Sequence, residues 1–357
     1  MDNRIPLPGP GVPDEGAAEG RYGTLYWKKN KYDYTMSYDS PDDNIADLRA
    51  QYPNGLHFIV GDIHGEVKTL KLLMEKIGFD PTKDHVYFLG DYNGGGNVTA
   101  LMQYLSNYYS PDTAVPGFHM IRGNHERELG PVYSLQNLPD VFVIREKQMD
   151  YYLAHAGMIR SVFDLIGEDM EKDPSKKVFS YGLTDESVAF DAPLRQMIWS
   201  RHGLYSQRAH WSKWPRNETL TARRACIIHG HSPYSFFMRQ QYFSYGEQTL
   251  FWKRQHVFFS ESLQSFNIDA NVKGRYENGE TYRGLACVCL EVLETVAANT
   301  DGKLTCEGIL NTQNAVFAVP YAPGWDAENQ GDPNRILSAA PEMKRIGANE
   351  NREPYFI

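Results

Sequence analysis

Five short apolar runs, each ending in a cluster of glycine and polar residues, constrain the fold of this chain more than any other feature. The runs cover residues 56–60, 85–89, 117–121, 151–154 and 226–228. Runs of this length predict buried β-strands. Apolar residues at helical spacing follow the first two runs, over 67–77 and 98–105, and Gly78 is a typical helix end. Strand, turn and helix in repetition predict an α/β sheet whose binding groups gather beyond the carboxyl ends of its strands.

Residues 22–320 are expected to form one domain, because no internal repeat or linker divides them. Residues 1–21 contain four prolines and few apolar residues, which predicts a flexible arm. A proline-containing tail covers residues 321–357. Further strands are predicted at 257–259, 266–268 and 285–292, with a tight hairpin turn at Asp301-Gly302. These strands would form a second sheet packed on the first.

Charge and hydropathy exclude several classes of protein. The chain has 45 acidic and 36 basic residues, and its net charge of −9 gives no general attraction to nucleic acid or to anionic membranes. No segment approaches the roughly 18 to 20 apolar residues of a membrane span, and the first residues lack the apolar core of a secretory signal. Four cysteines are too few for a disulfide scaffold at this length. We therefore expect a cytoplasmic location, with non-classical export left open.

The polar clusters contain side chains that suit a pair of metal ions. They read Gly61-Asp62-Ile63-His64-Gly65, Gly90-Asp91, Gly123-Asn124-His125-Glu126, His155-Ala156-Gly157 and Gly230-His231. Asp62 and His64 alternate along the chain, so both can reach one ion from an extended segment. The two carboxylate oxygens of Asp91 can bridge two ions. With Asn124, His155 and His231 the shell mixes nitrogen and oxygen, which suits manganese, iron or zinc better than calcium.

Each of these residues also has a structural interpretation. Asp and Asn after a strand often cap helices, and a single His is more often a satisfied core residue than a ligand. All six together favour metal binding, because two ions about 3.5 to 4 Å apart can activate a bridging water for in-line attack on phosphorus. His229 precedes its motif on the strand, and we interpret it as structural. Glu126 is interpreted in the same way.

In this order, the five clusters resemble those of the calcineurin-like metallophosphoesterases. The resemblance is to the phosphoprotein phosphatase group, closest to its bacterial and phage serine/threonine phosphatases, and spans about residues 56–290. It includes the run Gln-Met-Ile-Trp-Ser-Arg at 196–201 and the segment 267–269. It implies an α/β (α+β) four-layer sandwich, in which two mixed β-sheets pack together and are flanked by helices.

The resemblance also implies two divalent metal ions, manganese first, with iron or zinc as alternatives. The first ion would be bound by Asp62, His64 and Asp91. The second would be bound by Asp91, Asn124, His155 and His231. His125 would be the general acid that protonates the leaving oxygen. Its structural alternative is a hydrogen bond to one of the metal ligands, without contact to the metal itself.

The chain departs from the family after the bridging aspartate. The family continues Asp-x-Val-Asp-Arg-Gly, whereas residues 91–96 read Asp-Tyr-Asn-Gly-Gly-Gly. Gly94 and Gly95 therefore replace the aspartate that pairs with the general acid and the arginine that holds phosphate. The glycines would leave open space for a bulkier ester such as phosphotyrosine, or offer backbone amides to phosphate. A loop that has drifted without consequence is the alternative.

Other arginines remain available to hold phosphate. Arg201 matches a phosphate-binding position of the bacterial members, and its planar guanidinium suits a bidentate contact. Arg127 is a further candidate. Arg201 lies in a basic insertion around residues 195–224, which has seven basic residues, one acidic residue and three tryptophans. The insertion is predicted to border the cleft and contact the substrate, with a solvated basic face as the alternative.

These features predict a metal-dependent phosphoprotein phosphatase that hydrolyses phosphomonoesters on protein Ser, Thr or Tyr by attack of a metal-bridging water. Its partner would be a phosphorylated protein or peptide, and neither nucleic acid nor a membrane. One alternative is a hydrolase of dinucleoside polyphosphates such as diadenosine tetraphosphate. A second is a metal-binding pseudophosphatase that acts as a binding module. A nucleic-acid binder built on the basic insertion is disfavoured by the net charge.

Overall fold

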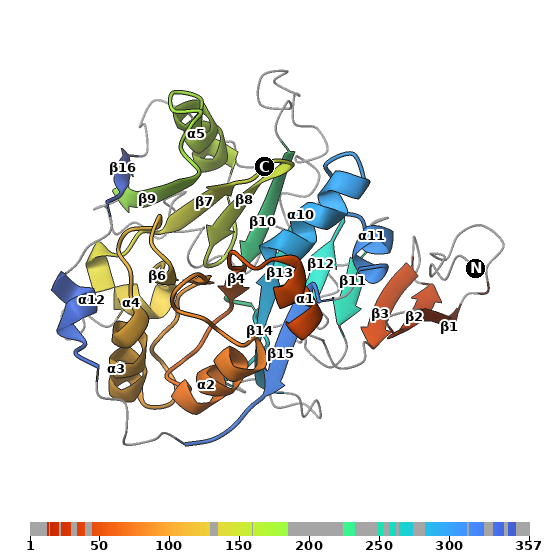
Figure 1. The fold of residues 1–357 in the computed structure, drawn as a ribbon, viewed down its shortest axis with the longest axis horizontal. Coiled ribbons are helices and arrows are strands. Elements are labelled where there is room, and N and C mark those ends of the chain that lie inside the picture. The colour runs from red at the N-terminus through yellow and green to blue at the C-terminus, as the bar shows by residue number, and fades with distance from the viewer. Residues whose placement is uncertain are drawn as a thin grey trace.

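Two mixed β-sheets form the centre of the molecule, and helices lie outside them (Figure 1). The computed structural model describes residues 13, 15–20, 23–29, 34–39, 45–128, 135–158, 160–184, 224–232, 249–252, 257–261, 264–273, 283–312, 314–324, 331–338 and 342–347. Among these residues, no helix has the length and hydropathy needed to cross a membrane.

The smaller sheet has five strands in the order β15-β14-β4-β5-β6. Its parallel strands are β4 (His57–Val60), β5 (His85–Phe88) and β6 (Gly117–Met120). The antiparallel strands are β14 (Gly284–Cys289) and β15 (Val316–Pro320). Helix α2 (Val67–Lys76) packs on β14 and β15, α3 (Val98–Tyr108) on β6, and α10 (Leu290–Asn299) on β4. The strands are buried almost throughout, because both faces of the sheet are covered.

The larger sheet has eleven strands in the order β1-β2-β3-β11-β12-β13-β10-β8-β7-β9-β16. Its central strands β13 (Ser265–Asn267), β10 (Arg224–His229) and β8 (Met149–Ala154) are parallel. On one side follow β7 (Val141–Arg145), β9 (Val178–Thr184) and β16 (Lys344–Gly347). On the other side follow β12 (Val257–Ser260), β11 (Thr249–Trp252), β3 (Tyr34–Asp39), β2 (Gly23–Lys29) and β1 (Glu15–Gly20).

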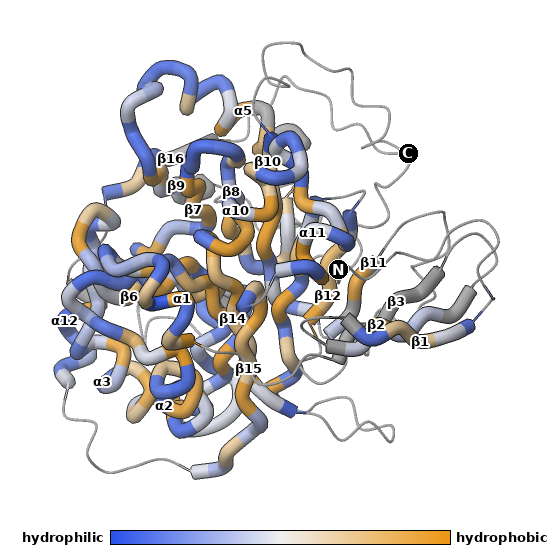
Figure 2. Tube along the Cα trace, turned by 45° about the vertical axis from the view of Figure 1, so that its right-hand side comes forward, coloured by the Kyte–Doolittle hydropathy of each residue, from blue (hydrophilic) through white to orange (hydrophobic). Residues whose placement is uncertain are grey.

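The two sheets share one apolar core. The ring of Tyr87 on β5 packs edge-on against Phe142 on β7, with 5.5 Å between their centroids. Figure 2 shows hydrophobic segments along the central strands, such as β14, and alternating hydropathy on the outer helices. Further helices within the described residues are α1 (Ile45–Gln51), α4 (Asn124–Glu128), α5 (Arg160–Met170), α11 (Cys306–Leu310), α12 (Asn334–Ser338) and the 3₁₀ turn Leu135–Asn137. The predicted fold, two mixed sheets flanked by helices, is confirmed.

One predicted strand is partly wrong. The run 285–292 was expected to be extended throughout, but β14 ends at Cys289 and α10 begins at Leu290. Leu290, Leu293 and Val296 are buried at helical spacing, so the apolar run joins a buried strand to a buried helix face. Asp301 and Gly302 do form a turn with φ of 55° and 68°, but it follows α10 instead of joining two strands.

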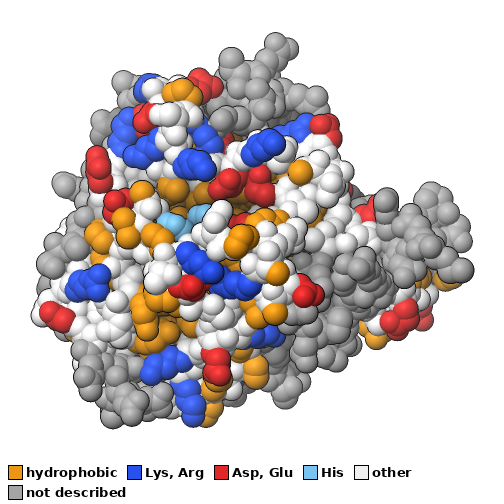
Figure 3. All heavy atoms as spheres, viewed as in Figure 1, with side chains coloured by type: hydrophobic (Ala, Val, Ile, Leu, Met, Phe, Trp, Pro, Cys, Tyr) orange, Lys and Arg blue, Asp and Glu red, His pale blue; other side chains and the backbone are white. Residues whose placement is uncertain are grey.

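Both ends of the chain contain more regular structure than expected. Residues 15–20 of the predicted arm form β1, which pairs with β2 along its whole length. In the predicted tail, α12 packs against α3, and β16 pairs with β9. The basic insertion at 195–224 lies outside the described residues, except for Arg224, which begins β10. On the face shown in Figure 3, the acidic and basic side chains of the described residues are intermixed.

Candidate metal centre

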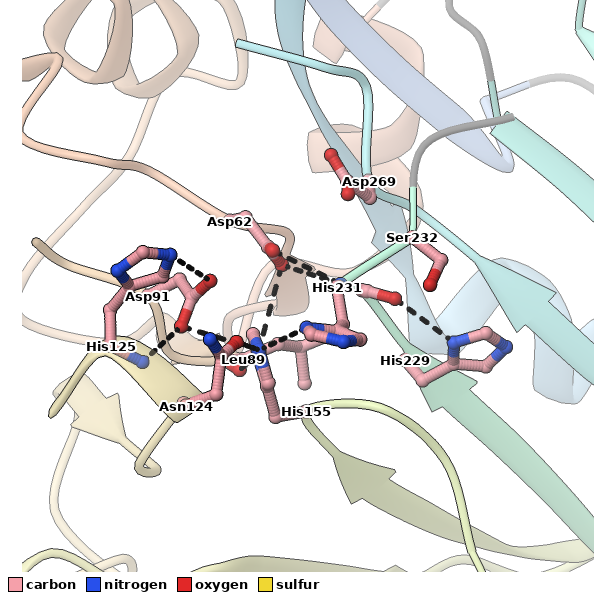
Figure 4. Close-up of polar contacts among 12 residues, drawn as sticks. Asp62, Leu89, Asp91, Asn124, His125, His155, His229, His231, Ser232 and Asp269 are labelled. Carbon is pink, nitrogen blue, oxygen red and sulfur yellow. Dashed lines mark hydrogen bonds and ion pairs between the residues drawn. The ribbon is translucent and has the colours of Figure 1, made fainter. Parts of the chain in front are cut away.

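Six predicted ligands come together where strands of the two sheets end. Figure 4 labels all of them except His64. From the smaller sheet, Asp62 and His64 follow β4, Asp91 follows β5, and Asn124 begins α4 after β6. From the larger sheet, His155 follows β8 and His231 follows β10. All six are buried. Residues up to 169 positions apart in the sequence therefore meet, as shown by the backbone N–H of His231, which donates to the Asp62 carboxylate at 3.0 and 3.1 Å.

Three of these residues have a backbone conformation that side chains rarely adopt. His64, Asp91 and His231 have φ of 51°, 53° and 67°. Left-handed backbone at residues other than glycine costs free energy, and it persists where the surroundings fix it, most often at functional sites. Glycines at positions 123 and 230 allow the backbone to approach the carboxylates of Asp91 and Asp62 closely. A Cβ at Gly123 would lie 2.2 Å from Asp91 Oδ1, and one at Gly230 would lie 2.0 Å from Asp62 Oδ1.

Two imidazole rings are oriented by backbone carbonyls. His155 Nδ1 lies 2.8 Å from the carbonyl oxygen of Leu89, and His64 Nδ1 lies 2.7 Å from that of Asn93. A carbonyl oxygen can only accept, so each Nδ1 carries the proton, and each neutral ring turns the lone pair of Nε2 inward. This is the usual arrangement of a metal-binding histidine. Burial lowers the pKa of His64 well below its usual value, and the charge of Lys273 lowers it further, so the ring is neutral.

Lone pairs converge around His155. Its Nε2 lies 2.9 Å from Asn124 Oδ1, 3.1 Å from His231 Nδ1 and 3.3 Å from Asp91 Oδ1. Carboxylate and amide oxygens and an unprotonated imidazole nitrogen repel one another at such distances unless a metal ion or a proton lies among them. Among the described residues, two clusters have metal-binding geometry, one of His64, Asp91 and His125 and one of Asp91, His155 and His231. Asp91 belongs to both, which is the position that a bridging ligand requires.

Buried negative charge gives the centre its affinity for cations. Burial raises the pKa of Asp62 well above its usual value, and the charges of Asp269 and Asp91 raise it further. Burial and the charge of Glu126 do the same for Asp91. Carboxylates this close cannot all be ionised without compensating positive charge. The donor set and the charge fit the dinuclear metal centre that is typical of the family, and they do not identify the metal.

Glu126 and His229 have the structural positions expected of them. The Glu126 carboxylate accepts the backbone N–H groups of Gly123, Asp91 and Tyr92 at 2.8, 2.8 and 2.9 Å. It thereby holds the loop after β5 against the start of α4. His229 lies to one side of the ligands in Figure 4, with Nδ1 3.2 Å from the Gly230 carbonyl oxygen.

The glycine run beside the centre is crowded, which contradicts the open space expected there. A Cβ at Gly94 would lie 2.6 Å from Lys273 Nζ and 2.9 Å from His125 Nδ1. At Gly95 it would lie 2.3 Å from the His64 carbonyl oxygen, and at Gly96 2.7 Å from that of Gly65. The loop is glycine-rich because neighbouring groups fill the space. The expectation that it makes room for a bulky ester is therefore wrong.

His125 remains next to the carboxylate that both metal clusters share. Its backbone N–H donates to Asp91 Oδ1 at 3.0 Å, and its Nε2 lies 3.8 Å from Asp91 Oδ2. The ring also meets that of His64 edge-on, with 5.3 Å between centroids. Arg201 and the side chain of Arg127 lie outside the described residues, so their proposed contacts with phosphate stay predictions.

Sequence reasoning missed two charged residues of the centre, Asp269 and Lys273. Both follow β13, in the segment whose resemblance to the family was noted only for residues 267–269. The Asp269 carboxylate lies beside Asp62 in Figure 4 and accepts the backbone N–H of Asn271 at 3.0 Å. The available signal was the acidic residue Asp269 directly after the predicted strand 266–268.

The calcineurin-like phosphoesterase family matches residues 58–274, which is more than half of the 357-residue chain. The chain therefore belongs to this family. It is similar to the symmetrical bis(5'-nucleosyl)-tetraphosphatase of Coxiella burnetii, with 37% identity over 82 residues, 23% of this chain and 25% of that protein. The corresponding protein of Photorhabdus laumondii is 33% identical over 78 residues, 22% of this chain and 26% of that protein. The chain thus matches about a quarter of the length of these curated relatives.

Solved structures with a similar fold have several activities. A protein serine/threonine phosphatase from Saccharomyces cerevisiae is 14% identical, with a TM-score of 0.39, over 78% of this chain and 84% of that chain. A putative diadenosine tetraphosphatase is 15% identical, with a TM-score of 0.36, over 76% of this chain and 96% of that chain. Likenesses this distant do not decide between substrates.

Proposed function

We propose that this phosphoesterase hydrolyses dinucleoside polyphosphates, cleaving a phosphoanhydride bond with water. The main support for a metal-dependent phosphoesterase activity is the arrangement around His155. Asn124 Oδ1, His231 Nδ1 and Asp91 Oδ1 all lie within 3.3 Å of its Nε2. The choice of substrate is supported by the partial similarity to symmetrical bis(5'-nucleosyl)-tetraphosphatases. It replaces protein phosphomonoesters, the first expectation from sequence, as the leading substrate class.

Asp62, His64 and Asp91 would hold one divalent ion, and Asp91, Asn124, His155 and His231 the other. Such ions supply Lewis acidity, which lowers the pKa of water and neutralises charge on phosphate. The chain fixes the ligands through the carbonyls of Leu89 and Asn93 and the carboxylate of Glu126. Manganese is our first choice of metal, with iron and zinc as alternatives.

The surroundings of His125 favour a good leaving group. Position 94 supplies no carboxylate to the ring, because it is glycine and its Cβ would lie 2.9 Å from His125 Nδ1. In the cleavage we propose, the oxygen of water bonds to phosphorus and its proton passes to solvent, while the bridging P–O bond breaks and the released phosphate oxygen keeps the electron pair. The second ionisation of a phosphate group has a pKa of about 6, against about 10 for the tyrosine hydroxyl. A polyphosphate leaving group therefore depends less on a strong general acid.

Phosphomonoesters on protein Ser, Thr or Tyr remain the second candidate. The observation that favours them is the position of His125, whose Nε2 lies 3.8 Å from Asp91 Oδ2, where it can serve leaving groups that need a proton. The partner would then be a phosphorylated protein or peptide. A pseudophosphatase that binds metal without turnover is the third reading.

A substrate panel with Mn²⁺ tests these readings. Diadenosine tetraphosphate is compared with peptides containing pSer, pThr or pTyr and with nitrophenyl phosphate, using EDTA-treated protein and Asp91→Asn as controls for contaminating activity. We expect kcat/KM to be at least about 10-fold higher on the dinucleotide, with two ADP as products of symmetrical cleavage. Faster hydrolysis of a phosphopeptide would select the second candidate. Bound metal without turnover of any substrate would select the third.

A further inference from the structure

Lys273 reaches the metal centre from the larger sheet. Its Nζ and His125 Nδ1 lie 2.6 and 2.9 Å from one point, the place where Gly94 would carry a Cβ. Nζ itself is buried. A lysine ammonium group therefore lies in the side-chain space of position 94, where the family has an aspartate. No local sequence pattern indicates this, because Lys273 follows a strand of the larger sheet and Gly94 follows a strand of the smaller sheet.

The loop that carries Lys273 is held by several hydrogen bonds. Asn267 Nδ2 donates to the Ser232 carbonyl at 2.6 Å, and Asn267 Oδ1 accepts the N–H of Asp269 at 2.9 Å. Asn271 then turns the chain with φ of 58°. Beyond it, the Arg283 guanidinium donates to the carbonyl of Val272 at 3.0 Å. The backbone next to the lysine is thus tied to both the larger sheet and β14.

We propose that the Lys273 ammonium group binds the substrate phosphate, from the space that Gly94 leaves without a side chain. The proposal rests on the proposed function only in that the substrate carries a phosphate. Nζ lies beside His125 and has three donors, and an ammonium group binds phosphate as a compact point charge. Gly94 is part of the same arrangement, because any side chain there would displace Nζ. A cation at this place suits a polyphosphate, whose charge exceeds that of a phosphomonoester.

A second role for Lys273 makes the opposite prediction. If its charge only offsets the buried carboxylates, the lysine competes with metal ions for the same negative field. Its removal would then strengthen metal binding and leave the affinity for phosphate unchanged. Removal of a phosphate-binding lysine would instead weaken phosphate binding while the metals stay in place.

Lys273→Met and Lys273→Arg separate the two roles, with Lys83→Met as the matched control. Lys83 precedes β5, at the end of the strand opposite to the centre, and its loss changes the net charge equally. We measure binding of inorganic phosphate to the Mn²⁺-loaded proteins by calorimetry, metal content by elemental analysis, and kcat and KM on nitrophenyl phosphate. Thermal midpoints show whether each variant is folded.

For Lys273→Met we expect phosphate affinity about 10- to 100-fold lower, the loss of one charge-assisted hydrogen bond, with metal content unchanged. Lys273→Arg should retain most of the affinity, and Lys83→Met all of it. Unchanged phosphate affinity in Lys273→Met, or a loss that follows loss of metal, would overturn the proposal. Phosphate binding is measured without any dinucleotide, so failure of the proposed substrate leaves this test intact.

Discussion

Replacing Asp91 by asparagine should have opposite effects on activity and on the stability of the metal-free protein. Asp91 is the residue common to both metal clusters, and its carboxylate is fully buried. Asparagine keeps the acceptor for the N–H of His125 but cannot bridge two ions as a carboxylate does. We therefore expect metal content to fall below two ions per chain and turnover to be abolished.

Without metals, the same substitution should stabilise the fold. Removing one of several buried carboxylates relieves a desolvation and repulsion cost on the order of 1 to 3 kcal/mol. At roughly 2 °C per kcal/mol for a large domain, Tm in EDTA should rise by about 2 to 6 °C. Burial raises the folded-state pKa of Asp91, so its contribution to stability is present below its unfolded pKa and is lost as pH rises through the folded value. The advantage of Asp91→Asn should therefore grow with pH.

Asp84→Asn is the control for burial alone. Asp84 is fully buried at the opposite end of β5, where it pairs with Arg49 at 2.5 Å and accepts the N–H of Leu56 at 3.0 Å. Its replacement should lower Tm by weakening that pair while two ions remain bound. Near-normal activity of Asp91→Asn with two ions retained would refute the bridging assignment. A lower Tm of Asp91→Asn in EDTA would refute the electrostatic argument.

His125→Asn should reduce the rate on poor leaving groups far more than on nitrophenyl phosphate, and equal losses in steady-state assays would remove His125 as the acid. Arg201→Ala should lower kcat/KM at least about 10²-fold, and if Arg201 and Lys273 hold the same phosphate, a double-mutant cycle should be non-additive. Burial lowers the pKa of His119 to about 3 and that of His85 to about 4. Each neutral ring therefore stabilises the fold less as pH falls below the unfolded pKa of about 6.5. Between pH 7 and 5, the free energy of unfolding of His119→Phe, measured by denaturant titration, should fall by about 2 kcal/mol less than that of the parent. An equal fall in both proteins would contradict this.

Sequence order was sufficient to predict that the six candidate ligands lie together, because each follows an apolar run that forms a strand. Asp62, Asp91 and Asn124 follow three parallel neighbours of one sheet, and parallel strands bring their carboxyl ends to the same edge. His155 and His231 follow parallel neighbours of the other sheet. Each polar cluster is adjacent in sequence to its strand, so the pattern can be recognised before the three-dimensional structure is known.

The missed features depend on contacts between distant segments. The sequence around Gly94 does not indicate that Lys273 Nζ fills the side-chain space at this position. The sequence therefore predicts empty space beside the glycines. The same contacts oppose a simple return to the family pattern. Gly94 has φ of 98°, which aspartate resists, and an arginine at Gly95 would begin 2.3 Å from a backbone oxygen. Strand β1 was missed because its residues are mostly small or acidic, and only pairing with β2 makes it extended.

The exchange of an aspartate at position 94 for a lysine from another sheet changes what His125 can do. A carboxylate beside an imidazole stabilises its protonated form, whereas an ammonium group disfavours it. Lys273 Nζ and His125 Nδ1 converge on one point, so the ring faces a cation where the family presents an anion. If Lys273 binds phosphate as we propose, this cation adds attraction for substrates that carry more negative charge. A polyphosphate would then gain more from it than an alkyl phosphomonoester.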